Sequence, residues 1–523
     1  MHLLCPEVSA RFSLDLRVLV FRSIFPLNKD TKNERRNIRL RYVSAPYLIN
    51  GLDRRKGSWS EELISFVMDQ LSPKSIKGRK RVTPMVKAKK RSVKGKISVV
   101  KVPNITEVRK TVDQNFPHLW PAVEAGLSVC ATLLLKDNAN PTALIYVGPA
   151  SAGKTTVASM FDEAVNEGEK LDEVKLVYRS DQFSPAAFVS HSATATRDDL
   201  DKIDLLPRIK DRVLLTPDLA TMFRGKTDEL AGRFSTITRV LDGQGFTRDS
   251  GMHGQRGYTG DYRFAWLGCT TPFTEIIWRA MAQLGSRLFF YSLHSLSQPT
   301  MDDLVQTITR RLPYQQMLTE CQQRVQTFLK ALFLKHGGVR TIRWEQKKTS
   351  KKVARTLAGL ASFLAIMRTH IEEDLHGSTQ PESPHRAHAV LHHIAQGHAI
   401  ISGRRQLTSE DLPLIARIAL SSMPLERRAV LEAFARHSGE PLSVSHVCDA
   451  TGVTGNTARK IMEQMDKLKI AHYDQQGMGK ASPLTLNPLW AASENNDMWE
   501  LIREVATSQK NGDVLAKNQE KPS

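Results

Sequence analysis

The sequence predicts an α/β protein, followed by a second, smaller domain. Over residues 107–300, short apolar strand-like segments alternate with helix-like segments, as in an α/β core. One strand-like segment runs directly into a glycine-rich loop and then into a helix-like segment. Residues 301–422 have mostly helical patterns, and residues 425–490 have the spacing of a separate small domain.

The composition favours a globular protein with an anionic partner. The chain has 523 residues, enough for several domains, and 41% of them are hydrophobic. Its net charge of +20 favours nucleic acid first and an anionic membrane surface second. The most apolar N-terminal stretch, 14–25, is interrupted by Asp15, Arg17 and Arg22, so neither a signal peptide nor a membrane span is expected. Five scattered cysteines without metal-site spacing indicate a reduced, cytoplasmic protein.

The first hundred residues contain a strongly basic segment. Residues 1–72 carry no pattern that assigns a function, although 60–71 fit one amphipathic helix. Residues 73–106 contain no acidic residue until Glu107, and twelve lysines and arginines lie between 74 and 101. Such a block repels itself and should be solvated. Two interpretations stay open, a linker and an arm that lies on a phosphate backbone.

The glycine-rich loop fits a phosphate-binding motif. Residues 148–155 read Gly-Pro-Ala-Ser-Ala-Gly-Lys-Thr, between a buried-strand pattern at 143–147 and a helical pattern at 155–161. This strand-to-helix context is the one that the motif needs. Lys154 is expected to reach the β- and γ-phosphates of ATP, and Thr155 to hold Mg²⁺. The expected nucleotide-binding residues are Gly148, Pro149, Ala150, Ser151, Ala152, Gly153, Lys154, Thr155 and Thr156.

A phosphate-binding loop needs an acidic partner at the end of a neighbouring strand, to hold Mg²⁺ and orient the attacking water. The apolar segment 212–218 ends in Asp218, which is the first candidate for both roles. Pro217 stands where a second acid is usual. Asp181 is therefore kept as a second candidate.

Two further segments resemble the AAA+ class of ATPases. The strand-like segment 263–272 ends in Thr270, Thr271 and Pro272, and Thr271 matches the position of the polar sensor residue of that class. Residues 284–291 resemble the segment that carries the arginine finger, which implies that Arg287 reaches the ATP of an adjacent subunit. The alternative for Arg287 is an ordinary surface ion pair.

Two other segments, 247–262 and 384–412, narrow the resemblance to one branch of the AAA+ class. Residues 247–262 contain four glycines with Arg248 and Arg256, and are similar to the pre-sensor hairpin of MCM helicases, MoxR-type ATPases and chelatases, which grips DNA in the helicases. A plain glycine-rich loop is the alternative. Residues 384–412 resemble the helical lid of that branch, which implies that Arg386 is the sensor-2 arginine on the γ-phosphate. His388 and His392, one turn apart, are expected to pack or be solvated rather than bind metal.

The C-terminal pattern resembles a winged helix. A short helix at 444–451, a glycine-containing turn and a longer helix at 455–469 form a helix-turn-helix signature, followed by two strand-like segments around a glycine-rich tip. Such domains bind DNA, and some mediate protein contacts instead. The candidate DNA contacts are Asn456, Thr457, Arg459 and Lys460 on the second helix, with Lys480 in the wing.

Together these patterns predict an AAA+ three-layer P-loop core with a helical lid, followed by a winged helix-turn-helix domain. The expected divisions are 1–72, the basic segment 73–106, the core 107–300, the lid region 301–422, the winged helix 425–490 and a polar, frayed tail 491–523. The expected function is a helicase-like, ATP-hydrolysing motor on DNA that works as a homo-oligomeric ring, with a virus or mobile element as a candidate source. The alternatives are an ATP-switched initiator, loader or regulator, and a MoxR-like protein remodeller.

Overall fold

The computed structural model describes most of residues 104–518 and two short strands nearer the N-terminus. The described ranges are 104–163, 175–190, 197–250, 254–283, 287–293, 312–345, 349–371, 381–475, 482–491 and 496–518, with single positions between 301 and 309. Residues 1–96 and 97–523 form two units. In the first unit, β1 (Leu52–Asp53) pairs antiparallel with β2 (Ser58–Trp59). The helix expected at 60–71 and residues 73–103 of the basic segment lie outside the described residues.

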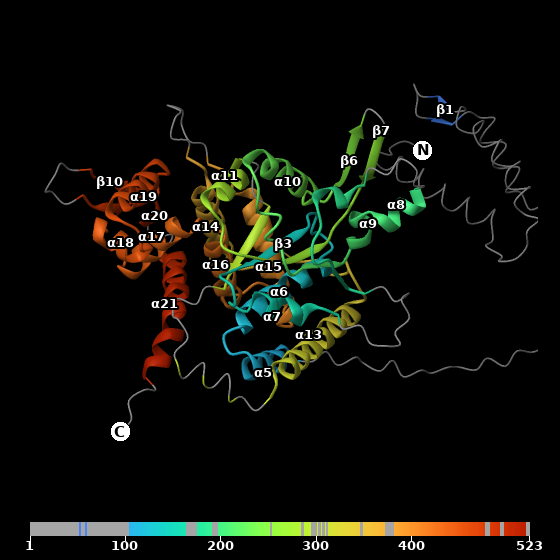
Figure 1. The fold of residues 1–523 in the computed structure, drawn as a ribbon, viewed down its shortest axis with the longest axis horizontal. Helices are drawn as coiled ribbons and strands as arrows, with labels where there is room; N and C mark the ends of the chain where they lie inside the picture. The colour runs from blue at the N-terminus through green and yellow to red at the C-terminus, as the bar shows by residue number, and fades with distance from the viewer. Residues whose placement is uncertain are drawn as a thin grey trace, which may run out of the picture. The chain divides into compact units, whose positions relative to one another are not determined.

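Five parallel strands form the central sheet of the second unit, in the order β4–β5–β8–β3–β9 (Figure 1). The strands are β3 (Thr142–Val147), β4 (Val177–Arg179), β5 (Val213–Thr216), β8 (Ala265–Thr270) and β9 (Leu288–Ser292). The strands expected at 143–147, 212–218 and 263–272 are thus confirmed, and β8 lies between the other two. The carboxyl ends of β3, β8 and β5 meet at one edge, where α/β sheets bind ligands.

Helices cover both faces of the sheet, so the core has three layers. Leu144 and Tyr146 of β3 face one cluster of buried residues, while Ala143 and Ile145 face another. This alternation follows from the two-residue period of a strand. On the first face lie α6 (Trp120–Ala131), α7 (Lys154–Phe161) and α13 (Tyr314–His336). On the second face lie α9 (Leu205–Ile209), α10 (Thr227–Val240) and α11 (Glu275–Gln283).

The region 301–422 is helical, as expected, and packs on the first face of the core. Its described helices are α13, α14 (Lys351–Arg368), α15 (His385–Ile401), η5 (Ser409–Asp411) and α16 (Leu412–Ser421). Helix α15 lies against α6 so closely that a Cβ on Gly397 would come within 2.0 Å of the Ser128 carbonyl oxygen. Smaller core elements are α5 (Ile105–Asn115), η2 (Thr132–Leu134), η3 (Pro185–Phe188) and α8 (Arg197–Ile203).

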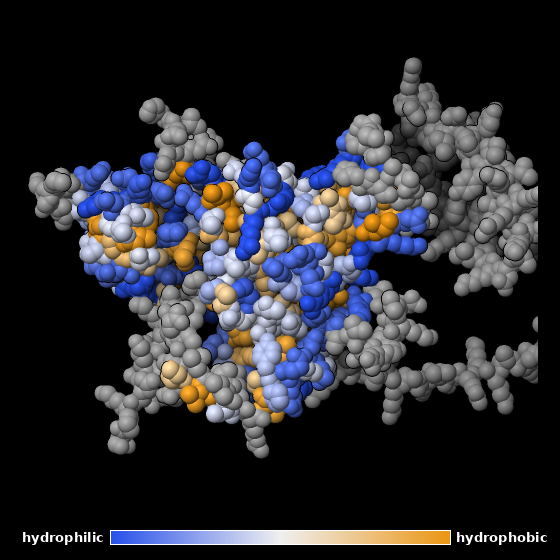
Figure 2. Space-filling view, viewed as in Figure 1, coloured by the Kyte–Doolittle hydropathy of each residue, from blue (hydrophilic) through white to orange (hydrophobic). Residues whose placement is uncertain are grey.

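The C-terminal region has the helices and strands that the sequence predicts. They are α17 (Leu425–Arg436), α18 (Val444–Thr451), α19 (Gly455–Lys467), β10 (Ala471–Tyr473), β11 (Leu484–Leu486) and α20 (Pro488–Ala491). Ser443 caps α18 by accepting a hydrogen bond from the His446 N–H, and Gly452 ends it with φ at 71°. Strands β10 and β11 pair antiparallel. Apolar side chains are visible where this region adjoins the core (Figure 2).

The segment 491–523, expected to be a polar tail, contains a helix with a buried apolar stripe. Helix α21 spans Asn496–Asn518, and its first turns pack against α16 and α17. Met498, Trp499, Ile502 and Val505 are buried there, and Trp499 stacks edge-on against Phe363 of α14. These apolar residues fall at helical spacing, so they form one buried stripe in an otherwise polar segment. In the part of the chain that the structure describes, no helix combines the length and apolar character that a membrane span requires.

Candidate nucleotide-binding site

The loop between β3 and α7 has the local geometry of a phosphate-binding loop. Gly153, at the N-cap of α7, has φ at 82°, and a Cβ there would come within 3.0 Å of Leu119. Both facts favour glycine at this position. Ser151 also has a positive φ, at 64°. The N-terminus of α7 follows directly, and such a terminus carries free N–H groups and the positive end of the helix dipole.

Lys154 lies over this loop. Its Nζ donates to the carbonyl oxygens of Gly148, at 2.8 Å, and Pro149, at 2.5 Å. Burial lowers the pKa of Lys154, and the charge of Asp218 acts in the opposite direction. Thr155 is exposed at the start of α7, whereas the Thr156 hydroxyl lies 2.9 Å from the Tyr314 hydroxyl. Lys154 and Thr155 are thus the first two residues of α7, directly after the loop.

Asp218 lies two residues beyond β5, at the same edge of the sheet as the loop. One of its oxygens accepts a 2.8 Å hydrogen bond from the Ala220 N–H, and the residue is exposed. Asp181 instead follows β4, one strand further from the loop, and pairs with Arg179 at 2.8 Å. Asp218 is thus the better placed of the two candidate acids.

Thr155 and Asp218 together offer what a nucleotide-bound Mg²⁺ requires. Mg²⁺ takes oxygen ligands and is usually held by one or two side chains, with phosphates and waters completing its shell. A hydroxyl and a carboxylate at one end of the sheet fit that pattern. The described residues contain no group of three His, Cys, Asp or Glu that could hold a metal alone.

Thr271 lies between the loop and the acid. The Thr270 carbonyl, at the end of β8, accepts a hydrogen bond from the Gly148 N–H at 3.3 Å. The Cys269 carbonyl accepts one from the Leu219 N–H at 2.8 Å. The end of β8 is therefore bonded both to the start of the loop and to the turn that carries Asp218. Thr271, the next residue, is exposed at this junction.

Cys269 was not singled out in the sequence, yet it touches the loop. Its thiol donates to the Lys154 carbonyl at 3.3 Å. Burial raises the pKa of Cys269 to about 12, so this thiol stays neutral at physiological pH. In the sequence, Cys269 lies within an apolar strand pattern. That pattern does not distinguish a cysteine that contacts the loop from an ordinary core residue.

Arg287 and Arg386 meet at the amino ends of the strands, which form the amino edge of the sheet, opposite the loop. Their Nε and Nη1 atoms lie 3.2 and 3.0 Å from the same oxygen of Asp242, just beyond α10. Leu288 pairs with Ala143, so Arg287 lies level with Thr142, six residues before Gly148, and at about 3.3 Å per residue it begins roughly 20 Å from the loop. The structure thus does not bring Arg386 to the phosphate loop of its own chain. Asp242 was missed because only tertiary structure links it to these arginines.

Glu382 adds a second carboxyl near the arginine pair. Burial raises the pKa of Glu382, and the charges of Arg368, Arg287 and Arg386 oppose the rise. Because burial is the larger effect, the carboxyl is held protonated to a higher pH than usual. The two arginines are therefore held by Asp242 and lie in the field of Glu382.

The hairpin expected at 247–262 is present as β6 (Gly245–Ser250) and β7 (Gly254–Thr259), just before β8. Arg248 and Arg256 are cross-strand partners. The Arg248 guanidinium donates to Thr236 of α10 at 3.0 Å and lies 4.9 Å from the Phe246 ring centre. Arg248 is thus bound to the body of the core, while 251–253 at the turn lie outside the described residues.

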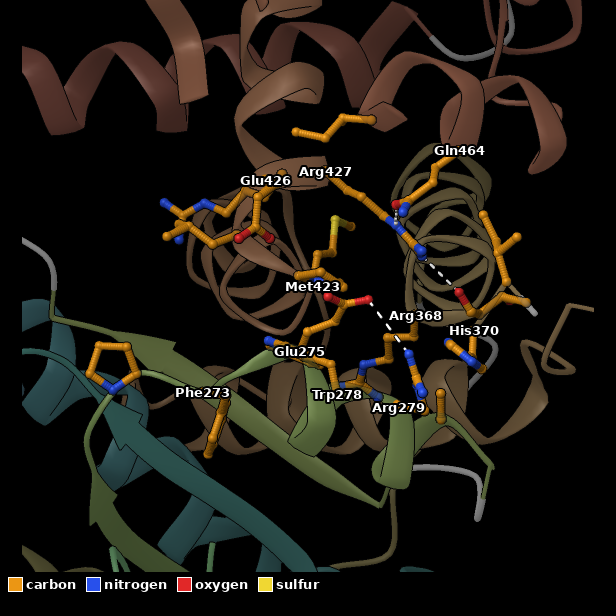
Figure 3. A pocket seen from close by; sticks show the side chains of 18 of the residues that line it. Phe273, Glu275, Trp278, Arg279, Arg368, His370, Met423, Glu426, Arg427 and Gln464 are labelled. Carbon is orange, nitrogen blue, oxygen red and sulfur yellow. Dashed lines mark hydrogen bonds and ion pairs between the residues drawn. The ribbon is translucent and has the colours of Figure 1, made fainter. Parts of the chain in front are cut away.

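The candidate DNA contacts on α19 are exposed, and three of them line a groove of about 960 Å³ between α19 and the core. These three are Asn456, Thr457 and Lys460. In this groove Gln464 of α19 lies beside Arg427 (Figure 3). Arg459 donates to the Asn456 side chain at 3.3 Å. Lys480 lies outside the described residues.

The histidines at the start of α15 show no sign of a metal site. The rings of His388 and His392 stack with centres 6.0 Å apart. Burial lowers the pKa of His392 to about 4, so its ring is neutral at physiological pH. The described residues contain no group of three His, Cys, Asp or Glu that could hold a metal ion, and these two rings pack against each other.

No family model and no curated protein matches the chain. Among solved structures, it is similar to a "putative ATPase" from Cytophaga hutchinsonii, with 10% identity and a TM-score of 0.29 over 69% of this chain and 95% of the other. It is also similar to a full-length MCM homolog from Methanopyrus kandleri, with 11% identity and a TM-score of 0.32 over 61% of this chain and 62% of the other. Identities of 10–11% and TM-scores of 0.29–0.32 assign no function to this chain.

Proposed function

We propose that the protein is an AAA+ ATPase that couples ATP hydrolysis to movement on DNA, in the manner of a helicase. The observation that carries the proposal is the meeting of three strand ends at one edge of the sheet. The loop with Lys154 follows β3, Thr271 follows β8 and Asp218 follows β5. A cation, a polar group and an acid beside a helix N-terminus are what phosphoryl transfer from a nucleotide requires.

Each residue at this edge has a defined part in the proposed reaction. Lys154 exchanges its loop carbonyls for the β- and γ-phosphates and neutralises their charge. Thr155 and Asp218 hold Mg²⁺, which when bound offsets the charge that develops on the phosphates. Asp218 orients the attacking water, and Thr271 donates to the γ-phosphate region.

The arginine pair supports a ring. Because Arg287 and Arg386 lie at the edge of the sheet opposite the phosphate loop, neither can act on its own chain's nucleotide in this arrangement. In a head-to-tail ring one subunit presents that edge to the next subunit's loop. We propose that both arginines serve the neighbour, which changes the expectation that Arg386 folds onto the γ-phosphate of its own subunit.

Two features favour a DNA substrate. The β6–β7 hairpin before the sensor strand favours the helicase-like reading over an initiator, which lacks that hairpin. The order α17, α18, α19, β10, β11, with Leu442 bridged to Leu484, supports a winged helix in which α19 is the recognition helix. The net charge of +20 also favours DNA over a protein substrate, and we propose a cytoplasmic location.

An ATPase assay with and without DNA tests the proposal. We expect steady-state hydrolysis that increases when single- or double-stranded DNA is added and is absent in Lys154→Ala. Slow hydrolysis that DNA does not change, together with tight DNA binding, would support an initiator or loader. Hydrolysis without any DNA binding would support a protein remodeller.

A further inference from the structure

The groove between α19 and the core has two helical walls. Helix α19 contributes Asn456 and Lys460. Helix α11 contributes Trp278 and Arg279, which Figure 3 shows. Arg279 and Lys460 are both exposed, on opposite walls. Arg279 has one acidic neighbour on its own helix, Glu275, at 3.9 Å. The front of α19 thus faces another part of the same chain across a confined space.

The floor of the groove carries two buried arginines. Arg368 and Arg427 come from α14 and α17, and in the described part of the chain they donate to neutral groups rather than to carboxylates. The carbonyl oxygens, at 2.7–2.9 Å, belong to Ser422, Leu288, Met367 and Thr369. Burial lowers the pKa of both guanidiniums to about 10, so both are charged at neutral pH. The charge of Glu382 acts on Arg368, and the charges of Glu426 and Glu275, which also line the groove, act on Arg427, but in the described residues no carboxylate pairs directly with either guanidinium. Buried positive charge without a directly paired carboxylate favours an anionic ligand.

The size of the groove argues against a duplex. A recognition helix reads duplex DNA by entering a major groove about 12 Å wide. A volume of about 960 Å³ lies within the range of pockets for small ligands, roughly 300–1,000 Å³. A few nucleotides of single strand fit such a space, but a duplex does not. A half-buried aromatic ring, Trp278, lines it, and single-strand sites combine basic grooves with aromatic rings on which bases stack.

We propose that this groove binds single-stranded nucleic acid, with its phosphates beside Arg279 and Lys460 and a base against Trp278. The proposal rests on the DNA-directed function above and assigns it a strand type and a site. The groove is also lined by Pro272 and Phe273, the residues next to Thr271. A strand in the groove therefore contacts the segment that joins the sensor residue to α11.

The test compares two charge-reversed variants of the full chain. The first is Arg279→Glu with Lys460→Glu, one on each wall. The matched control is Lys330→Glu with Lys335→Glu, both exposed on α13, outside the groove. Fluorescence anisotropy measures binding of a labelled oligothymidine strand and of a labelled hairpin duplex. Because both variants change the net charge equally, their difference reports the groove itself.

We expect the groove variant to bind the single strand at least about tenfold more weakly than the control variant at the same salt concentration, since charge contacts to phosphates dominate such affinity. Duplex binding should differ little between the two variants. Trp278→Leu should weaken single-strand binding by about 5- to 150-fold, the range for loss of one base-stacking contact. Thermal unfolding of each variant separates this loss from misfolding.

Two outcomes overturn the proposal alone. One is equal binding of the single strand by the groove and control variants, and the other is a loss confined to the duplex. Both leave DNA binding intact elsewhere in the chain. If the wild-type protein binds neither probe, the groove proposal and the DNA-directed part of the proposed function fall together.

Discussion

The two edges of the parallel sheet carry the residues that we assign to opposite halves of the proposed phosphoryl-transfer site. At the carboxyl edge, Lys154 and Asp218 lie around a helix N-terminus. At the amino edge, Arg287 and Arg386 share one oxygen of Asp242. The first edge carries the residues proposed to hold a nucleotide and its metal, and the loop at 148–155 contains no arginine. The second edge has two arginines but no phosphate-binding loop.

Under the proposed function, this difference means that one copy of the chain would hold an incomplete site. The strands fix the separation of the two edges, because β3 and β9 pair in register along their length. The proposed ring would bring the amino edge of one copy to the carboxyl edge of the next. In a single copy, the Asp242 carboxylate pairs with the guanidiniums of Arg287 and Arg386. In the proposed ring, the phosphates of a nucleotide on the neighbouring copy would compete with Asp242 for these two guanidiniums.

Lys154→Ala should have the largest effect, because it removes the only cation that the structure places over the phosphate loop among the described residues. We expect hydrolysis to be abolished, since no other residue there can neutralise the β- and γ-phosphates. Steady-state ATP turnover measures this. Turnover within about tenfold of the wild type, a barrier change of only about 1.4 kcal/mol, would refute the loop assignment.

Arg287→Ala tests the amino edge. A finger arginine is worth roughly 10³–10⁵ in turnover, whereas a surface ion pair is worth about 0–1 kcal/mol. We therefore expect nearly normal ATP binding with turnover reduced by that factor. Equilibrium binding of a fluorescent ATP analogue and steady-state turnover separate the two effects. Arg109→Ala, which breaks an exposed pair on α5, is the control and should change neither.

The helix that carries Arg386 is anchored at its other end by a charged histidine. Burial opposes the charge on His398, but hydrogen bonds to Asp411, at 2.6 Å, and Glu124 outweigh it and raise its pKa to about 9. Since the folded pKa lies above the ordinary value of 6.5, this stabilisation is full below about pH 6.5 and is lost as pH rises through 9.

Urea unfolding between pH 6 and 10 measures that contribution. We expect the free energy of unfolding to fall by about 2–3 kcal/mol over this range in the wild type. His398→Gln should remove most of the pH dependence. The same slope in both proteins would show that His398 is not the group that titrates.

Asp242→Asn should have a smaller effect. The change removes the carboxylate that Arg287 and Arg386 share, and their side chains are only 18% and 31% exposed. We expect the free energy of unfolding to fall by about 1–2 kcal/mol, between the values for exposed and buried pairs. Asp113→Asn, which breaks an exposed pair on α5, should change it by less than about 0.5 kcal/mol. Equal losses in the two variants would mean that Asp242 does not hold the arginines.

The carboxyl edge could be predicted from the sequence because its parts are local. The loop motif is contiguous, and the strands before Lys154, Asp218 and Thr271 each carry a clear apolar pattern. Parallel strands then bring their ends to one edge without further information. The positions of these residues in the fold agree with that expectation, while their chemical roles stay predictions.

The amino edge could be predicted only in part. Arg287 and Arg386 were named by resemblance, but Asp242 has no sequence pattern that joins it to either. The buried stripe of α21 includes Met498, Trp499 and Ile502. Polar residues surround these three in the sequence, so the segment has no clear helical pattern of apolar residues. The groove at α19 depends on how two distant helices approach, which no local pattern records.

Mixing Arg287→Ala with Lys154→Ala tests the central claim, that a site is built from two copies. Each variant alone should be inactive, but at a neighbouring pair one subunit supplies an intact loop and the other an intact finger. With random mixing, about one quarter of the interfaces would combine them, so we expect turnover to recover to roughly that fraction of the wild type. Native mass spectrometry verifies that the assemblies are mixed. Verified mixed assemblies without any recovery would contradict the two-copy site.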